Sequence, residues 1–405
     1  MDWAAADAVA AEHGASFFLF DEAKFRANFT NLQAAFDAHY PHTRIGYSYK
    51  TNYTPYLCRI VHALGGYAEV VSEMEYDLAR RLGIEGPRII FNGPYKAGAA
   101  FRDAALRGAR INLDSSRDTE LLVDAARDNP GKTFDVVIRC NFPLAADAVS
   151  RFGMDVEGAA FRTTLTAIDH AANIRLAGLH CHFPDRDLDS FGRRARKMVA
   201  LTRQIFPDAP PDLLNIGGGY FSDMPEALRQ SFGVPPARFE DYGALVGGIL
   251  QDAFGGTGTP PALFLEPGTA IVADTFRFYT RVVGTKTVRG RHFATVAGSI
   301  FDISPTARSR NLPAQALCQG GGASQDEPYD IVGFTCIEGD ILTEGLAAPL
   351  ATGDFITFGN VGSYSVVMRP PFILPANPIL VAQDDGIKVI KNRETGSDVF
   401  RNFVF

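Results

Sequence analysis

The segment Arg44-Ile45-Gly46-Tyr47-Ser48-Tyr49-Lys50-Thr51-Asn52 is a short run of bulky residues that ends on a single lysine. The bulky run predicts a strand, and the polar turn with Pro55 predicts where that strand ends. A lysine at the carboxyl end of a buried strand is costly unless it has a partner or a covalent role. For an isolated strand, a lysine in solvent is the simpler interpretation. The rest of the chain reverses that preference, because it supplies seven more such strands, and nearly all carry their unusual residues at the same end.

Predicted strands and helices alternate along most of the chain. A short helix, a strand at 16–20 and a helix that Asp21 can cap precede the alternation. The alternating strands are expected at residues 44–50, 65–72, 88–93, 110–115, 134–142, 174–183, 213–219 and 262–268, with helical patterns such as 74–82, 97–107, 119–128 and 189–206 between them. This order predicts an α/β fold, a (β/α)8 TIM barrel. A doubly wound open sheet is the alternative, but it usually has fewer strands and a glycine-rich turn after the first.

The sequence changes character after Thr269, where helical periodicity fades. Short β-rich runs separated by Gly and Pro follow, as in an all-β module. These runs are residues 276–283, 292–297, 329–334, 354–358, 363–368 and 386–390. We therefore expect a barrel domain at 21–270 and a C-terminal all-β domain, a sandwich or a barrel of strands, at 271–405.

Composition excludes several classes of protein. A chain of 405 residues is long enough for two domains, and 46% hydrophobic residues are enough for packed cores. A net charge of −7 gives no support for binding nucleic acid or an anionic membrane surface. Five widely spaced cysteines without a CxxC pair fit a reducing compartment. No apolar run reaches the roughly 18 residues of a membrane helix, and no basic signal segment opens the chain, so we expect a cytoplasmic protein.

Chemistry-bearing residues gather at the carboxyl ends of the predicted strands, where barrels of this class place their active sites. Besides Lys50 these are Ser72, Glu73, Asn92, Asp114, Ser115, Arg139, His180, His182, Gly217, Gly218, Gly219 and Glu266. Three glycines after the seventh strand allow an anion to approach the backbone closely, although they also suit a tight turn. Glu266 could hold a heterocyclic nitrogen protonated or could be a solvated acid.

The two histidines after the sixth strand admit three interpretations. His180 and His182 point to the same face because side chains alternate along a strand. They could ligate a metal, but no third ligand has convincing spacing, so no metal is expected. A flat imidazole packed on a flat ring, or a structural histidine, remains. A phosphate cup, a strand-end lysine, an opposing carboxylate and a histidine at the side together fit pyridoxal 5′-phosphate.

The chain resembles the fold-type III pyridoxal-phosphate decarboxylases, the group of diaminopimelate, ornithine and arginine decarboxylases. The matching pieces, in order along nearly the whole chain, are Tyr49-Lys50-Thr51-Asn52, Glu69-Val70-Val71-Ser72, Ser150-Arg151-Phe152-Gly153, Gly178-Leu179-His180-Cys181-His182, Asn215-Ile216-Gly217-Gly218-Gly219, Glu266-Pro267-Gly268, Cys336-Ile337-Glu338-Gly339-Asp340 and Gly362-Ser363-Tyr364. The resemblance implies an alanine-racemase-like barrel and a β domain that also takes in residues 1–20.

The resemblance also implies roles for particular residues. Lys50 would carry the cofactor, Glu266 would pair with its ring nitrogen, and His182 would stack on the ring. The backbone N–H groups of Gly217 to Gly219 would hold the phosphate with help from Tyr364. Cys336 would act as the acid that protonates the carbanion, reaching the site from the second subunit of a homodimer with shared active sites. No nucleic acid or membrane partner is implied.

Departures from the family pattern concern the phosphate and the substrate. Phe183-Pro184-Asp185 stands where the family usually has Ile or Val, Gly and Ser, and Thr269 stands where it usually has arginine. Asp185 cannot lie against a phosphate without a counter-charge. The segment that grips diaminopimelate in the family is also changed, so that substrate is not expected. Arg308 and Arg310 either bind a substrate carboxylate or are solvated loop residues.

These departures suggest decarboxylation of an amino acid or a conjugated amino acid. The leading substrate is an amino acid already conjugated to citrate in siderophore biosynthesis, or another compound of secondary metabolism. One alternative is an amino-acid racemase of the same fold, although a racemase does not usually carry the Glu266 and Cys336 segments. The other is a decarboxylase-derived binding protein that has lost its cofactor. Retention of Lys50, Glu266 and Cys336 argues against the second alternative.

Overall fold

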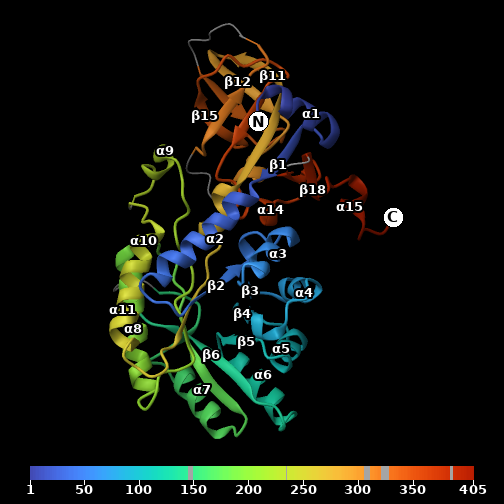
Figure 1. Cartoon of the computed structure of the whole chain (residues 1–405). Helices are drawn as coiled ribbons and strands as arrows, with labels where there is room; N and C mark the ends of the chain where they lie inside the picture. Colours follow the sequence, from blue (N-terminus) through green and yellow to red (C-terminus); the bar gives the residue numbers. More distant parts are fainter. Residues whose placement is uncertain (145–148, 234, 305–310, 321–327, 384–385) are drawn as a thin grey trace. The chain divides into compact units, whose positions relative to one another are not determined.

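The computed structural model describes residues 1–144, 149–233, 235–304, 311–320, 328–383 and 386–405. The chain forms two compact units (Figure 1). The barrel unit comprises Arg26–Phe221 and Pro236–Ala270, and the sheet unit comprises Met1–Phe25, Ser222–Pro235 and Ile271–Phe405. Ser222–Pro235 therefore packs with the sheet unit, although the predicted boundaries of 21–270 place it in the barrel.

Eight parallel strands close into a ring within the described part of the barrel unit, which confirms the predicted fold class. Their bounds are β2 Thr43–Ser48, β3 Tyr67–Val70, β4 Ile89–Phe91, β5 Arg110–Leu113, β6 Phe134–Asn141, β8 Ile174–His180, β9 Leu213–Asn215 and β10 Ala262–Leu265. The ring closes because β10 pairs with both β9 and β2. A short β7, Met154–Asp155, adds to β6. Every predicted strand is present, but several end earlier than expected because the polar residues after them form turns.

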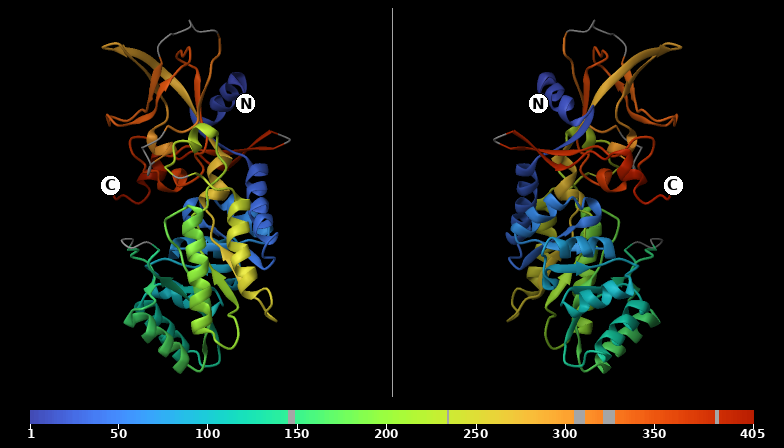
Figure 2. Two further views of the ribbon diagram at one scale, coloured as in Figure 1. Left: turned by 90° about the vertical axis from the view of Figure 1, so that its left-hand side faces the viewer. Right: turned by 90° about the vertical axis from the view of Figure 1, so that its right-hand side faces the viewer.

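Helices lie outside this ring (Figure 1). Their bounds are α2 Glu22–Asp37, α3 Pro55–Ala63, α4 Glu73–Arg81, α5 Gly98–Leu106, α6 Ser116–Arg127, α7 Ala159–His170, α8 Leu188–Ile205, α10 Phe239–Tyr242 and α11 Gly248–Phe254. Helix α8 shows why they form: Asp187 caps it by accepting a hydrogen bond from the Ser190 N–H at 2.8 Å, and Phe191, Ala195 and Met198 bury one face. Helix α8 runs beside α11 (Figure 2).

Large apolar side chains fill the interior of the barrel near the start of its strands. Tyr67, Ile90, Val137, Leu213 and Phe264 form one buried cluster, and the Tyr67 and Phe264 rings meet edge to face at 5.0 Å. A barrel of this size has no open pore, because side chains pack its centre in layers. The polar side chains of the barrel interior therefore lie at the opposite, carboxyl ends of the strands.

The sheet unit is built on a mixed sheet. Its path runs β15-β14-β12-β11-β1-β17-β18, and β16 joins β11 to β13. The bounds are β1 Ser16–Phe20, β11 Phe276–Val288, β12 Arg291–Val296, β13 Ala314–Leu317, β14 Tyr329–Val332, β15 Ile341–Leu346, β16 Phe355–Phe358, β17 Ile379–Gln383 and β18 Gly386–Lys391. The N-terminal strand β1 lies between β11 and β17, and Phe17 stacks on Tyr279 at 4.9 Å.

Short helices interrupt the sheet unit. They are α1 Trp3–His13, α9 Glu226–Arg229, α12 Thr269–Val272 at the unit boundary, α13 Ile300–Ile303, α14 Ser365–Met368 and α15 Gly396–Phe400. The strand predicted at 363–368 is wrong, because Tyr364 adopts a positive φ of 65° and starts α14. Strands β13, β15 and β17 were not predicted. No helix in the described ranges is both long and apolar enough to cross a membrane.

Candidate active site

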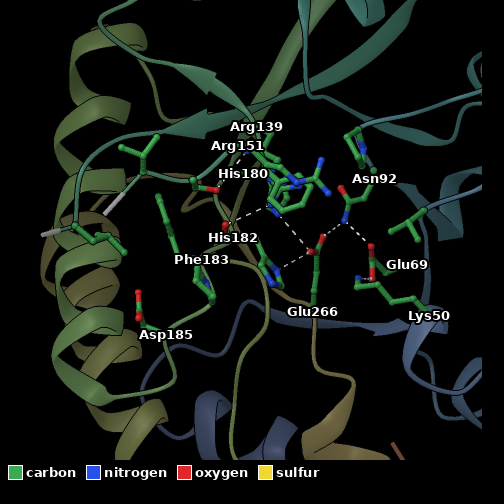
Figure 3. A pocket seen from close by; sticks show the side chains of 18 residues that line it. Lys50, Glu69, Asn92, Arg139, Arg151, His180, His182, Phe183, Asp185 and Glu266 are labelled. Atoms are coloured by element: carbon green, nitrogen blue, oxygen red, sulfur yellow. Dashed lines mark hydrogen bonds and ion pairs between the residues drawn. The ribbon is translucent and has the colours of Figure 1, made fainter. Parts of the chain in front are cut away.

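A cavity of about 640 Å³ opens at the carboxyl ends of the barrel strands (Figure 3). Its lining comes from the carboxyl ends of six strands and from the loops that follow them. The lining residues are Lys50, Glu69, Val71, Asn92, Gly93, Pro94, Arg139, Leu144, Val149, Ser150, Arg151, Phe152, His180, His182, Phe183, Pro184, Asp185 and Glu266. Lys50, His182 and Glu266, which the sequence singled out, therefore line one cavity. Figure 3 shows Lys50 and Glu69 at one side and Phe183 and Asp185 at the other.

Lys50 lies just past β2, in a short 3-10 turn, Tyr49–Thr51. Its Nζ is 2.6 Å from the Glu69 Oε2 and 3.2 Å from the Ser48 Oγ. The Glu69 side chain is fully buried, whereas 32% of the Lys50 side chain is exposed to the cavity. A buried carboxylate thus holds the ammonium group in place and leaves part of it accessible.

Glu266 is the most strongly constrained carboxylate of the cavity. Its Oε1 accepts hydrogen bonds from the Asn92 Nδ2 at 2.8 Å and the Asn215 Nδ2 at 2.7 Å. Its Oε2 lies 3.3 Å from the His180 Nε2 and 3.9 Å from the His182 Nδ1. Burial opposes ionisation, but the neighbouring histidines, His180 above all, outweigh it and hold the pKa of Glu266 well below its usual range. Glu266 is therefore an ionised carboxylate at neutral pH.

Asn92 joins the two carboxylates. Its Nδ2 also donates to the Glu69 Oε1 at 2.8 Å, and its Oδ1 accepts from the Asn112 Nδ2 at 2.5 Å. Lys50, Glu69, Asn92 and Glu266 consequently form one continuous polar chain across the end of the barrel. Each member fixes the next, so the chain is preorganised.

His182 presents its ring to the cavity, with 29% of the side chain exposed. Its Nδ1 accepts a hydrogen bond from the Gly218 N–H at 3.1 Å, so the neutral ring carries its proton on Nε2. Burial lowers the pKa of His182 to about 4, which keeps the ring neutral at physiological pH. His180 is 1% exposed, and within the described residues neither of its ring nitrogens has a hydrogen-bond partner.

The structure provides the third metal-ligand candidate that spacing did not reveal. Donor atoms of His180, His182 and Glu266 all lie within 4.8 Å of one another. The His182 Nδ1 already accepts the Gly218 N–H, and one Glu266 oxygen already accepts two amides. These commitments leave fewer than three free donors, so the arrangement suits a hydrogen-bonding ring better than a cation.

The glycine loop after β9 has a backbone that only glycine tolerates. Gly217 and Gly219 have φ of 72° and 105°, and a Cβ on Gly218 would lie 2.2 Å from the Glu266 carbonyl oxygen. The Gly217 N–H donates to the Asn215 Oδ1 at 2.9 Å, and the Gly218 N–H to His182. Of the three glycines, only Gly219 has no acceptor for its N–H in the described structure. The expected set of three phosphate-binding N–H groups is thereby reduced to one in this conformation.

Charged and apolar side chains alternate around the opening of the cavity. The Arg139 Nη1 lies 3.2 Å from the Asp114 Oδ1, so this guanidinium is neutralised. Arg151 stacks its guanidinium 4.0 Å from the centre of the Phe152 ring and forms no ion pair with a described residue. Arg151 thus places a positive charge at the opening of the cavity.

Cys336 and Tyr364 belong to the sheet unit and not to the cavity described above. Cys336 is exposed in the loop between β14 and β15, which Asp340 anchors by accepting from the Thr335 Oγ1 at 2.6 Å. Tyr364 adopts a positive φ, which bulky residues rarely do outside functional or strained sites. Arg308 and Arg310 lie outside the described residues.

Other strand-end residues have local roles. Ser72 caps α4 by accepting from the Glu75 N–H at 3.2 Å, and Ser115 is the N-cap residue of α6. Sequence reasoning did not assign a site role to Glu69, Asn112 or Asn215. Their signal was polarity inside otherwise apolar strands, which burial without a partner would make costly.

The family model of the pyridoxal binding domain of pyridoxal-dependent decarboxylases matches residues 23–273, and the chain belongs to this family. A probable chloroplastic diaminopimelate decarboxylase of Oryza sativa subsp. japonica is 27% identical, covering 98% of this chain and 81% of that protein. Diaminopimelate decarboxylase of Deinococcus radiodurans is 28% identical, covering 96% of this chain and 95% of its own.

Solved structures share the fold. Diaminopimelate decarboxylase from M. jannaschii superposes with a TM-score of 0.87 at 20% identity, covering 98% of this chain and 94% of that one. Lysine decarboxylase from Selenomonas ruminantium gives a TM-score of 0.78 at 21% identity, covering 94% and 95%. The protein is therefore a pyridoxal-phosphate-dependent amino-acid decarboxylase. The buried Glu266 carboxylate and the glycine loop, whose Gly219 N–H has no acceptor among the described residues, fit a ring nitrogen and a phosphate, so the residues present suit this cofactor.

Proposed function

We propose that the cavity is the cofactor site, with Lys50 as the covalent attachment point and Glu266 as the partner of the ring nitrogen. The observation that carries this assignment is the buried Glu266 carboxylate, linked through Asn92 to the Glu69–Lys50 pair. His182 would pack against the ring, and the loop of Gly217, Gly218 and Gly219 would hold the phosphate. When bound, pyridoxal phosphate supplies an electron sink for the bond to the departing carboxylate.

The chain's own groups then have definite tasks. Glu266 would keep a proton on the ring nitrogen, because a carboxylate that is buried and ionised stabilises a neighbouring positive charge strongly. Glu69 and Ser48 hold the Lys50 Nζ where it can exchange a proton. His182 stays neutral and adds no repulsion to the protonated ring.

We further propose that the substrate is an α-amino acid with a carboxylate at its far end. Arg151, without an ion-pair partner in the described structure, supports an anionic group at the opening. Three of the relatives named above are diaminopimelate decarboxylases, and diaminopimelate has such a carboxylate. The departures at Phe183-Pro184-Asp185 and Thr269 favour instead a citryl-conjugated diamino acid of siderophore biosynthesis. Arg308 and Arg310 remain proposed contributors to the same contact.

A product screen separates these substrates. Purified enzyme with cofactor is incubated with diaminopimelate, citryl-conjugated diamino acids, ornithine and lysine, and products and released carbon dioxide are measured by mass spectrometry. We expect turnover of a substrate with a distal carboxylate and poor turnover of ornithine and lysine. Preference for ornithine or lysine would refute the proposed role of Arg151. Racemisation without carbon dioxide release would refute decarboxylation.

We propose also that the enzyme is a homodimer in which Cys336 of one chain is the acid for the site built on Lys50 of the other. Closed two-fold dimers are the commonest assemblies and can share sites in this way. Tyr364 would close the site of its own chain. Mixing inactive Lys50→Ala and Cys336→Ala chains should then restore about a quarter of wild-type activity, because about half the dimers are mixed and each has one intact site. Absence of recovery after demonstrated subunit exchange would refute shared sites or the role of Cys336.

A further inference from the structure

Arg194 is a fully buried arginine in the middle of α8, with 0% of its surface exposed. Its guanidinium binds the backbone of two loops at once. Nη1 donates to the Gly218 carbonyl oxygen at 3.1 Å, and Nη2 donates to the Asp185 carbonyl oxygen. Nη2 and Nε also share the Ser190 Oγ, at 3.2 and 3.3 Å. One side chain therefore connects the glycine loop after β9 to the loop after β8.

All these hydrogen-bond acceptors are neutral. Within the described residues no carboxylate lies in ion-pair distance of Arg194, although Asp185 and Asp187 are near enough to raise its pKa against the lowering effect of burial. The rings of Phe191, at 4.2 Å, and Phe183, at 5.8 Å, complete its surroundings. A buried guanidinium remains charged, and burying a charge without an opposite charge is unfavourable. An anion bound close to Arg194 would therefore stabilise this buried charge.

The geometry shows where that anion would lie. The Arg194 Nη1 is 3.9 Å from the position that a Cβ on Gly219 would occupy, so the cation stands directly behind the glycine loop. In a planar trans peptide the C=O and the next N–H point in opposite directions. Because Arg194 holds the Gly218 carbonyl, the Gly219 N–H points away from Arg194. That is the glycine N–H without an acceptor.

We propose that Arg194 is a positioning residue that orients the Gly218–Gly219 peptide toward the phosphate of the cofactor and supplies the positive charge behind it. The inference rests on the proposed cofactor site. This role would explain how the phosphate is held although Thr269 stands where the family usually has arginine and Asp185 adds a negative charge. Arg194 would supply the positive charge that these two positions lack. The charge acts through the loop and does not touch the substrate.

The test measures binding and not turnover. Cofactor-free protein is titrated with pyridoxal 5′-phosphate and with pyridoxal, and dissociation constants are read from visible absorbance and protein fluorescence. In Arg194→Met we expect the constant for pyridoxal 5′-phosphate to rise about tenfold or more, while that for pyridoxal changes less than about threefold. Arg194→Lys keeps the positive charge but not the several N–H donors of the guanidinium. Its dissociation constant for pyridoxal 5′-phosphate should lie between those of the wild type and Arg194→Met. Arg193→Met, on the exposed side of the same helix, should leave both constants unchanged.

The ratio of the two constants within one variant does not depend on how much of the sample is folded. Equal weakening of both ligands in Arg194→Met, or no weakening, would overturn the proposal, because a merely structural arginine does not discriminate for phosphate. Gly218→Ala separates this failure from a wrong cofactor site. If Gly218→Ala loses the preference for phosphate and Arg194→Met keeps it, only the role of Arg194 is refuted. If neither loses it, the glycine loop is not the phosphate site.

Discussion

The floor and the rim of the cavity are built in opposite ways. The floor, defined as Lys50, Glu69, Asn92, Asn215 and Glu266, is a buried network in which the polar groups are paired with one another. The rim, defined as Arg151, Phe183, Pro184 and Asp185, mixes exposed charges with apolar surface. A paired, buried network is rigid and intolerant of change, whereas unpaired charges at an opening are available to a ligand. The difference assigns chemistry to the floor and substrate selection to the rim.

Removing the lysine of the floor should have the largest effect on the enzyme. Lys50→Ala is expected to abolish turnover and the visible absorbance of bound cofactor together, since no other amine lines the described cavity. Decarboxylation assays and absorbance spectra of the purified variant measure both. Lys132→Ala, an exposed lysine of the same unit, is the control. A Lys50→Ala enzyme that kept both properties would place the attachment elsewhere.

Removing the charge of the floor while keeping its shape should have the next largest effect. Glu266→Gln preserves one oxygen acceptor but cannot hold a proton on the ring nitrogen, so kcat should fall about 100-fold or more. KM for the substrate should change far less. Steady-state kinetics at saturating cofactor give both values. A variant with wild-type kcat would show that the ring is not kept protonated by this residue.

Behind the floor lies Glu75, whose Oε2 accepts the Val71 N–H at 2.8 Å. Burial raises its pKa from 4.5 to about 7. A carboxyl with a raised folded pKa binds its proton more tightly in the folded state, so its stabilising effect is full at low pH and is lost as pH rises from about 4.5 to 7. The free energy of unfolding of Glu75→Gln should therefore exceed that of the wild type by up to about 3 kcal/mol at pH 8, and by much less at pH 5.

Urea unfolding of the cofactor-free protein at both pH values tests this difference. Glu73→Gln, an exposed neighbour on the same helix with the same change in charge, is the control. An equal effect of Glu75→Gln at both pH values would mean that Glu75 is ionised in the folded protein across this range.

The rim should respond most weakly and most selectively. Arg151→Met should raise KM for a substrate with a distal carboxylate about fivefold and leave kcat within about twofold, because an exposed charge contributes on the order of 1 kcal/mol. Ornithine, if it reacts at all, should be unaffected. Competition between ornithine and the substrate with a distal carboxylate measures the ratio of their kcat/KM values directly. A fall in kcat without a change in KM would assign Arg151 to the chemistry instead.

The alternation of strands and helices was sufficient to predict the barrel. Bulky runs such as Phe134–Asn141 ended at polar residues, and closure of the ring then brought Lys50, His182 and Glu266 together. The sheet unit was less predictable, since β13 and β15 are short and only partly buried. The strand expected at 363–368 became a helix because Tyr364 adopts a backbone conformation that its residue type does not announce.

The supporting residues of the site were harder to predict than its chemistry. Arg194 lies in the run Arg193-Arg194-Ala195-Arg196-Lys197, which has the composition of a solvated helix face. Its burial depends on the loops that close over α8, which local pattern does not encode. The proximity of Glu266 to His180 and His182 was also not predictable from local pattern. These residues are far apart in sequence, and closure of the barrel brings them together.

Closure of the barrel also bears on self-association. A closed ring of strands has no free edge, whereas the described sheet of the other unit has edge strands β13, β15 and β18. The Asn311 amide covers the outer backbone at Glu344, donating to its carbonyl and accepting from its N–H, and Lys388 and Lys391 place charge on β18. Both features oppose strand addition by another molecule. The strands of the barrel, by contrast, become available for pairing with another molecule only after the ring opens and releases their edges.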